Sequence, residues 1–66
     1  MNYKLRKDKF RTALLNNGMS ITDISNKSKV STVTLDKIIN HEGFARAKTC
    51  LKIATALNTK VTELFE

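Results

Sequence analysis

The sequence predicts an all-α fold, a compact bundle of about five short helices in a single domain over residues 1–66. Proline is absent and only two glycines occur, which suits helices joined by short connections. Apolar residues recur at helical spacing in four segments, and no segment alternates strictly as a half-buried strand does. Residues typical of helix ends stand between these segments. We therefore expect a mostly helical protein with no appreciable sheet.

The first predicted helix runs from about residue 4 to residue 17. Gly18 follows it, at a position where a left-handed residue commonly ends a helix. The same segment is rich in lysine and arginine, which form either the polar face of this helix or an arm toward a polyanion. At i, i+3 and i+4 spacing its inward stripe consists of Phe10, Ala13 and Leu14.

The middle of the chain predicts two short helices joined by a tight turn. Ser20 is a suitable N-cap for a helix at about 21–28, and Asp23 is placed to complete a capping box. Ser31 is a suitable N-cap for a helix at about 32–40. The residues expected where these helices meet the core are Ile24, Val30, Leu35 and Ile38. This arrangement is typical of the helix-turn-helix, which places its second helix in the DNA major groove.

The last third of the chain predicts a loop over 41–45 and a fourth helix over about 47–57. Asn58 is expected in the left-handed region at the end of this helix. A last short helix is expected to begin at Thr62. In the loop, Phe44 is expected to cover the core or to contact a second copy. The inward face of the fourth helix is predicted to consist of Leu51, Ala54 and Leu57.

Composition limits the possible functions. The chain has 12 Lys and Arg against 6 Asp and Glu, a net charge of +6 that favours a polyanionic partner. One histidine, one cysteine and scattered acids do not form a catalytic or metal-binding constellation, so we expect no enzyme, cofactor, metal or small-molecule ligand. Cys50 is interpreted as a small buried thiol. With no long apolar run, we expect no membrane partner and a cytoplasmic location.

With these elements in place, the chain resembles the lambda-repressor-like, or XRE, family of helix-turn-helix domains. The resemblance covers about residues 10–65 and rests on three pieces: SITDISNKSKVSTVTLDKII, the polar loop NHEGFAR, and CLKIATALNTKVTELF. Lys29 stands where the family usually has glycine, so we expect positive φ there. Ile21 stands where the family often has a phosphate-binding glutamine.

The resemblance implies which side chains contact DNA. The base contacts it implies, on the outward face of the third helix, are Thr32, Val33, Thr34 and Lys37. Asp36 shares that face, but we interpret it as solvated, because phosphates repel a carboxylate. The candidates for phosphate contacts at both edges of this helix are Ser20, Thr22, Lys27, Ser31, Asn40, His41, Arg46 and Lys48.

The function expected from this resemblance is a sequence-specific DNA-binding transcriptional regulator, most simply a repressor. In one alternative the chain binds DNA but acts as a Cro-like antirepressor, an antitoxin or an architectural factor. Another alternative is a protein–protein adaptor that keeps the fold without binding DNA. Because one small domain covers few base pairs, we expect a homodimer on a near-palindromic double-stranded operator.

Overall fold

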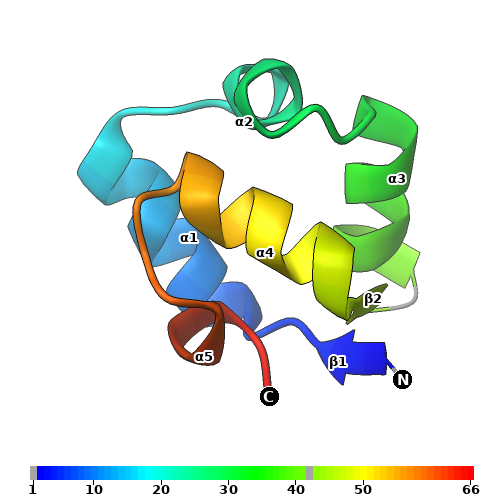
Figure 1. Cartoon of the computed structure of the whole chain (residues 1–66). Helices are drawn as coiled ribbons and strands as arrows, with labels where there is room; N and C mark the ends of the chain where they lie inside the picture. Colours follow the sequence, from blue (N-terminus) through cyan, green and yellow to red (C-terminus); the bar gives the residue numbers. More distant parts are fainter. Residues whose placement is uncertain (1, 42) are drawn as a thin grey trace.

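The computed structural model describes residues 2–41 and 43–66, and these fold as a small helical bundle with a two-stranded sheet at one edge (Figure 1). Glu42 of the predicted loop and Met1 lie outside the described residues. Among the described residues, η1 is a π-helical turn that continues α3. In chain order the elements are β1 (Asn2–Lys4), α1 (Lys7–Asn17), α2 (Ile21–Ser28), α3 (Thr32–Asp36), η1 (Lys37–His41), β2 (Phe44–Arg46), α4 (Ala47–Ala56) and α5 (Val61–Leu64).

A single cluster of buried side chains forms the core. Helix α4 crosses the centre of the molecule and packs against α2, α5 and both strands (Figure 1). Helix α3 packs against α2. The largest side chains with almost no exposed surface are Ile24, Leu35, Ile53, Leu57, Leu64 and Cys50. Every element therefore presents one face to the same core and leaves the other to solvent.

The left-handed conformations predicted at three helix ends are confirmed. Gly18 follows α1 with φ 60°, and Asn58 lies just beyond α4 with φ 54°. Lys29 ends α2 with φ 64°, and its backbone N–H donates to the Ser25 carbonyl 3.0 Å away. For a residue with a side chain this conformation costs about 1 kcal/mol or more. Val30, directly after it, is buried, so the left-handed turn directs an apolar side chain into the core.

The prediction of a mostly helical protein is confirmed, but the expectation of no appreciable sheet is wrong. Strands β1 and β2 pair antiparallel, with Tyr3 opposite Ala45. The first helix consequently begins at Lys7, not near residue 4, and the predicted loop contains a strand. Leu5 is buried between β1 and α1 and forms a bridge with Phe65. Pairing between segments about forty residues apart leaves no local signal in the sequence, which explains why it was not anticipated.

Three further boundaries differ from the expectation. The helical segment predicted for 32–40 is α-helical only to Asp36 and then π-helical through His41. Helix α4 ends at Ala56, and α5 begins one residue early, at Val61.

The predicted inward face of the fourth helix is also wrong at one position. Leu51 is 59% exposed. The buried residues of α4 are Cys50, Ile53, Ala54 and Ala56, and buried Leu57 follows directly after the helix. Cys50 and Ile53, which flank the expected face, thus take the place of Leu51. The i, i+3, i+4, i+7 set starting at residue 50 outcompetes the i, i+3, i+6 set starting at residue 51.

Replacement of Leu35 by alanine should lower the free energy of unfolding by about 2–5 kcal/mol, because Leu35 is fully buried and its loss leaves a cavity. Chemical denaturation measures the change. Leu15→Ala is the matched control, since Leu15 is 80% exposed and should change stability little. Equal unfolding curves for the two variants would show that Leu35 does not anchor α3.

Candidate nucleic-acid interface

The outward face of α3 is a short, exposed surface of mixed chemistry. Thr32, Thr34 and Lys37 are all exposed. Val33 is 66% exposed, an unusual position for a β-branched apolar side chain. Leu35 and Ile38 point the other way, into the core. Burial of these two residues thus fixes which side of the helical segment faces solvent.

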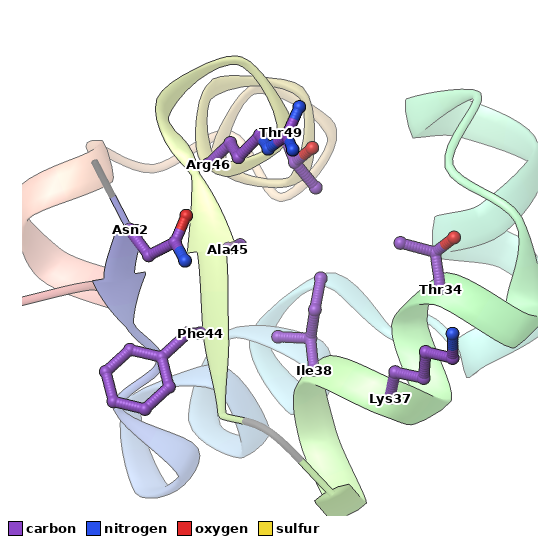
Figure 2. Close-up of a pocket in the computed structure, with 8 residues that line it drawn as sticks. All are labelled: Asn2, Thr34, Lys37, Ile38, Phe44, Ala45, Arg46 and Thr49. Atoms are coloured by element: carbon purple, nitrogen blue, oxygen red, sulfur yellow. The ribbon is translucent and has the colours of Figure 1, made fainter.

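Beside this face lies a cavity of about 300 Å³ between α3, η1, β2 and the start of α4. Figure 2 shows Thr34 and Lys37 on one wall and Arg46 with Thr49 on the other. Ile38 and Ala45 line the cavity from their buried positions. The cavity is therefore lined by two cationic side chains, Lys37 and Arg46, and by the Thr49 side chain next to Arg46. Such a set of donors suits an oxyanion such as a phosphate.

The N-terminal residues of α2 and α3 use their side chains as caps. The backbone N–H and the hydroxyl of Ser20 both donate to the Asp23 carboxylate, over 2.9 and 3.1 Å, and the Asp23 N–H donates back to the Ser20 hydroxyl. These hydrogen bonds hold the pKa of Asp23 below its ordinary value of 3.8. The Ser31 hydroxyl accepts from the Thr34 N–H and donates to the Thr34 hydroxyl oxygen. The capping roles expected of Ser20 and Ser31 are confirmed.

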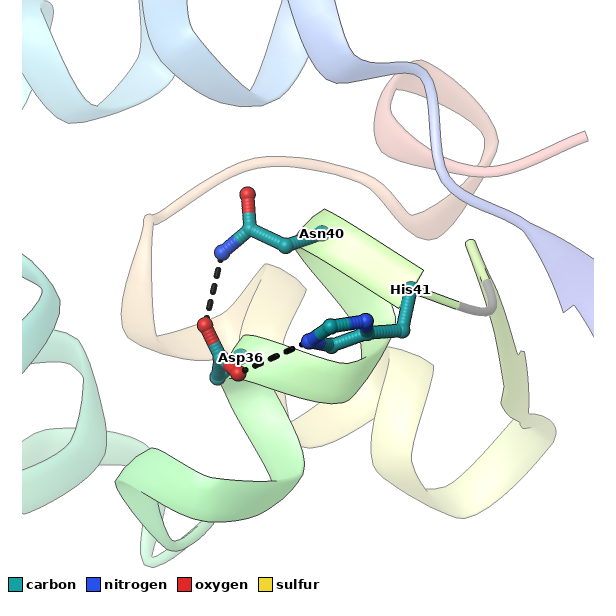
Figure 3. A network of polar contacts seen from close by, with 3 residues as sticks. All are labelled: Asp36, Asn40 and His41. Carbon is teal, nitrogen blue, oxygen red and sulfur yellow. Dashed lines mark hydrogen bonds and ion pairs between the residues drawn. The ribbon is translucent and has the colours of Figure 1, made fainter.

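Asp36 makes polar contacts with Asn40 and His41, two of the candidates for phosphate contact. Its carboxylate accepts a 2.7 Å hydrogen bond from the Asn40 amide and lies 3.4 Å from Nε2 of His41 (Figure 3). All three side chains are exposed. The Asp36 carboxylate therefore points along the helical segment toward Asn40 and His41 of η1. Asn40 and His41 are held by Asp36, an arrangement that the sequence reading of Asp36 as simply solvated did not include.

The remaining candidates are distributed over different surfaces. Thr22 and Lys48 are exposed on α2 and α4. Lys27 lies at the C-terminal end of α2 and lines a separate groove with Leu51 of α4. Of the predicted set, the cavity brings together Thr34, Lys37 and Arg46 only.

Sequence reasoning missed two residues that line the cavity, Asn2 and Thr49. Thr49 lies three residues after Arg46, a helical spacing that could have suggested it. Asn2 reaches the cavity only because β1 pairs with β2, with Asn2 opposite Arg46. No feature of the N-terminal sequence by itself points to that position.

Neither the cysteine nor any cluster of possible metal ligands adds a second candidate site among the described residues. Cys50 is buried, as expected, and its thiol donates to the Ala45 carbonyl over 3.5 Å. Burial raises the pKa of the Cys50 thiol and so keeps it protonated. Within residues 2–41 and 43–66, no three His, Cys, Asp or Glu side chains group as metal ligands do. No helix in this part of the chain has the length and apolar character required to cross a bilayer.

Comparison of the chain with models of known families, with curated proteins and with solved structures finds no match. The candidate interface therefore depends on the geometry above and on the resemblance of the sequence motifs.

The contribution of Asp23 to stability should depend on pH. Because its pKa is lowered in the folded protein, the carboxylate stabilises the fold above its ordinary pKa, and this contribution is lost as pH falls through the lowered value. The unfolding free energies of the native chain and of Asp23→Asn should therefore differ at pH about 6 and converge toward pH about 2. Urea denaturation across this range measures both.

The same comparison made in chains that also carry Ser20→Ala is the control, because that change removes the hydroxyl donor to Asp23 and keeps the backbone N–H donor. There the pH dependence of the difference should be reduced but not abolished, because the backbone hydrogen bond is the larger cause of the lowered pKa. A difference between the native chain and Asp23→Asn that is constant with pH would contradict the assignment.

Proposed function

We propose that the chain is a sequence-specific DNA-binding transcriptional regulator, a repressor, in which α2 and α3 form a helix-turn-helix and α3 enters the major groove. A bound domain of this kind represses by occupying DNA, which requires no catalytic group. The observation that carries the proposal is the outward face of α3, with an exposed valine between two threonines and a basic cavity directly beside it.

The composition of the α3 face supports base contact. Exposed valine and threonine methyl groups suit the thymine methyl in the major groove. The Thr32 hydroxyl suits a base edge or a phosphate, and Lys37 suits guanine or a phosphate. Val33 is 66% exposed, so its side chain is free to contact a thymine methyl group. Leu35, buried on the opposite side, holds this face outward.

The cavity supports contact with the DNA backbone next to the bases. Lys37 and Arg46 are on opposite walls, and Thr49 adds a hydroxyl donor beside Arg46 (Figure 2). Arg46 also precedes α4, whose first backbone amides have no side-chain cap. Uncapped amides at a helix N-terminus attract a phosphate. We infer that a phosphate on one strand occupies this cavity while Val33 contacts a base.

A binding assay on random-sequence duplex DNA separates this proposal from the adaptor alternative. A gel shift should show binding at low salt that weakens steeply as salt rises, because the released counterions drive association. An adaptor that has lost DNA contacts would leave the duplex unshifted at low salt and at moderate salt, and that result would overturn the proposal.

Val33→Ala should weaken binding to the preferred duplex by about 1–3 kcal/mol and relax the preference at one base pair. Arg46→Ala should instead weaken binding to all duplexes alike and lower the salt slope by about one unit. Fluorescence anisotropy titrations at several salt concentrations measure both effects.

Lys60→Ala is the matched control for charge, because Lys60 is exposed beyond the opposite end of α4 from Arg46. It should change the salt slope much less than Arg46→Ala does. The proposed roles are wrong if Arg46→Ala alters sequence preference while Val33→Ala leaves it intact.

We further propose a homodimer on DNA. The described residues span at most 29 Å, less than one turn of B-DNA at about 34 Å, so one domain contacts few base pairs. Two copies related by a two-fold axis double the site and place their α3 helices about 34 Å apart. Sedimentation with a selected duplex should show two chains on a near-palindromic site with half-site centres about 10–11 base pairs apart. One chain per duplex on an asymmetric site would contradict the dimer.

A further inference from the structure

Leu51 is an exposed leucine on the solvent-facing side of α4, where its neighbours are polar. It is 59% exposed, and its neighbours Lys52 and Thr55 are also exposed. Other residues of α4, from Cys50 to Leu57, supply the core, so Leu51 is not needed there. A single exposed leucine is ordinary on a protein surface, and Leu15 on α1 is 80% exposed. Leu51 differs from Leu15 because it lines a groove flanked by lysines, which offers a partner an apolar contact and positive charge together.

The groove lies between α2 and α4, which pack against each other, and has a volume of about 340 Å³. Its floor is apolar. Ser28, at its base, is buried, and its hydroxyl donates to the Ile24 carbonyl and accepts from the Val30 N–H. That hydroxyl is thus already satisfied within the protein. What the groove offers to a partner is the Leu51 side chain and the aliphatic stems of lysines, because Ala56 is buried in the core.

The charges around the groove are all of one sign. Lys27 of α2 and Lys52 of α4 line it, and none of the described residues that line it is acidic. An apolar floor with cationic residues from both helices matches a segment that has an apolar anchor and flanking carboxylates. A phosphate backbone would match the lysines but would leave Leu51 uncovered.

We propose that the α2–α4 groove, lined by Lys27, Ser28, Leu51, Lys52, Thr55 and Ala56, docks an acidic amphipathic segment of a partner protein. The segment places an apolar side chain against Leu51 and its carboxylates near Lys27 and Lys52. The mode is that of a helix laid in a groove, with apolar anchors one turn apart. Because the surface is small, the interaction is weak and relies on charge for its rate and selectivity.

A second copy of the chain is a poor occupant for this groove. Placed face to face across a two-fold axis, it would bring Lys27 and Lys52 against the same lysines, and the whole chain carries a net charge of +6. The groove also shares no lining residue with the cavity beside α3. Docking here is therefore compatible with a free α3 face and does not depend on DNA binding.

The experiment selects peptides of about 15 residues, long enough to form a helix on binding, from a random displayed library against the full chain. Enriched peptides are synthesised and titrated by fluorescence anisotropy against the native chain, Leu51→Ala and the double variant Lys27→Glu/Lys52→Glu. Leu15→Ala is the control, because it removes another exposed leucine, 80% exposed on α1, that lies outside the groove. Circular dichroism melting establishes that each variant is folded. If Leu51→Ala does not fold, the affinity of the double variant for the peptides decides the test.

The expected result is enrichment of peptides that combine Asp or Glu with leucine-like anchors one turn apart. Their affinity should fall about tenfold for Leu51→Ala and for the double variant, and remain unchanged for Leu15→Ala. The proposal is overturned if no peptide is enriched, or if the enriched peptides bind all variants alike. It is also overturned if the double variant loses affinity for duplex DNA while peptide binding is unaffected, since the groove would then be a DNA-backbone surface.

Discussion

Burial of Leu35 is the interaction on which the rest of the structure depends. Leu35 has no exposed surface and belongs to the same buried cluster as Ile24 of α2 and Ile53 of α4. A five-residue helix has almost no stability of its own, so its position follows from this tertiary packing. Because Leu35 and Ile38 point inward, the side chains between them and before them point outward. The same packing therefore holds the core together and orients the proposed DNA-contacting face.

The turn between α2 and α3 contributes the second constraint. Lys29 adopts a left-handed conformation so that Val30 can enter the core, and Ser31 then caps α3. The conformational strain at Lys29 is of order 1 kcal/mol, whereas burial of a valine side chain stabilises by about 1.5–3 kcal/mol. The free energy gained by burying Val30 exceeds the strain at Lys29, so the left-handed turn is favoured. At the other end of α2, Ser20 and Asp23 fix where the helix begins, so local caps mark the first residues of both helices.

Local signals in the sequence predicted much of this arrangement, and long-range ones did not. Gly18, Ser20 and Ser31 mark helix ends by their own chemistry, and all three were correctly placed. The pairing of β1 with β2 joins residues about forty positions apart, which no local signal connects, so the sequence predicts neither this pairing nor the position of Asn2. Leu51 was assigned to the core because two overlapping helical spacings are possible on α4, and only packing decides between them.

The central claim is that the outward face of α3 and the adjoining cavity bind DNA. Nuclear magnetic resonance titration of the labelled chain with duplex DNA tests it most directly, because each backbone amide reports its own surroundings. We predict the largest shift changes at Thr32, Val33, Thr34 and Lys37 and at the start of α4 from Arg46 to Thr49. Absence of any change, or changes confined to the groove around Leu51, would contradict the account.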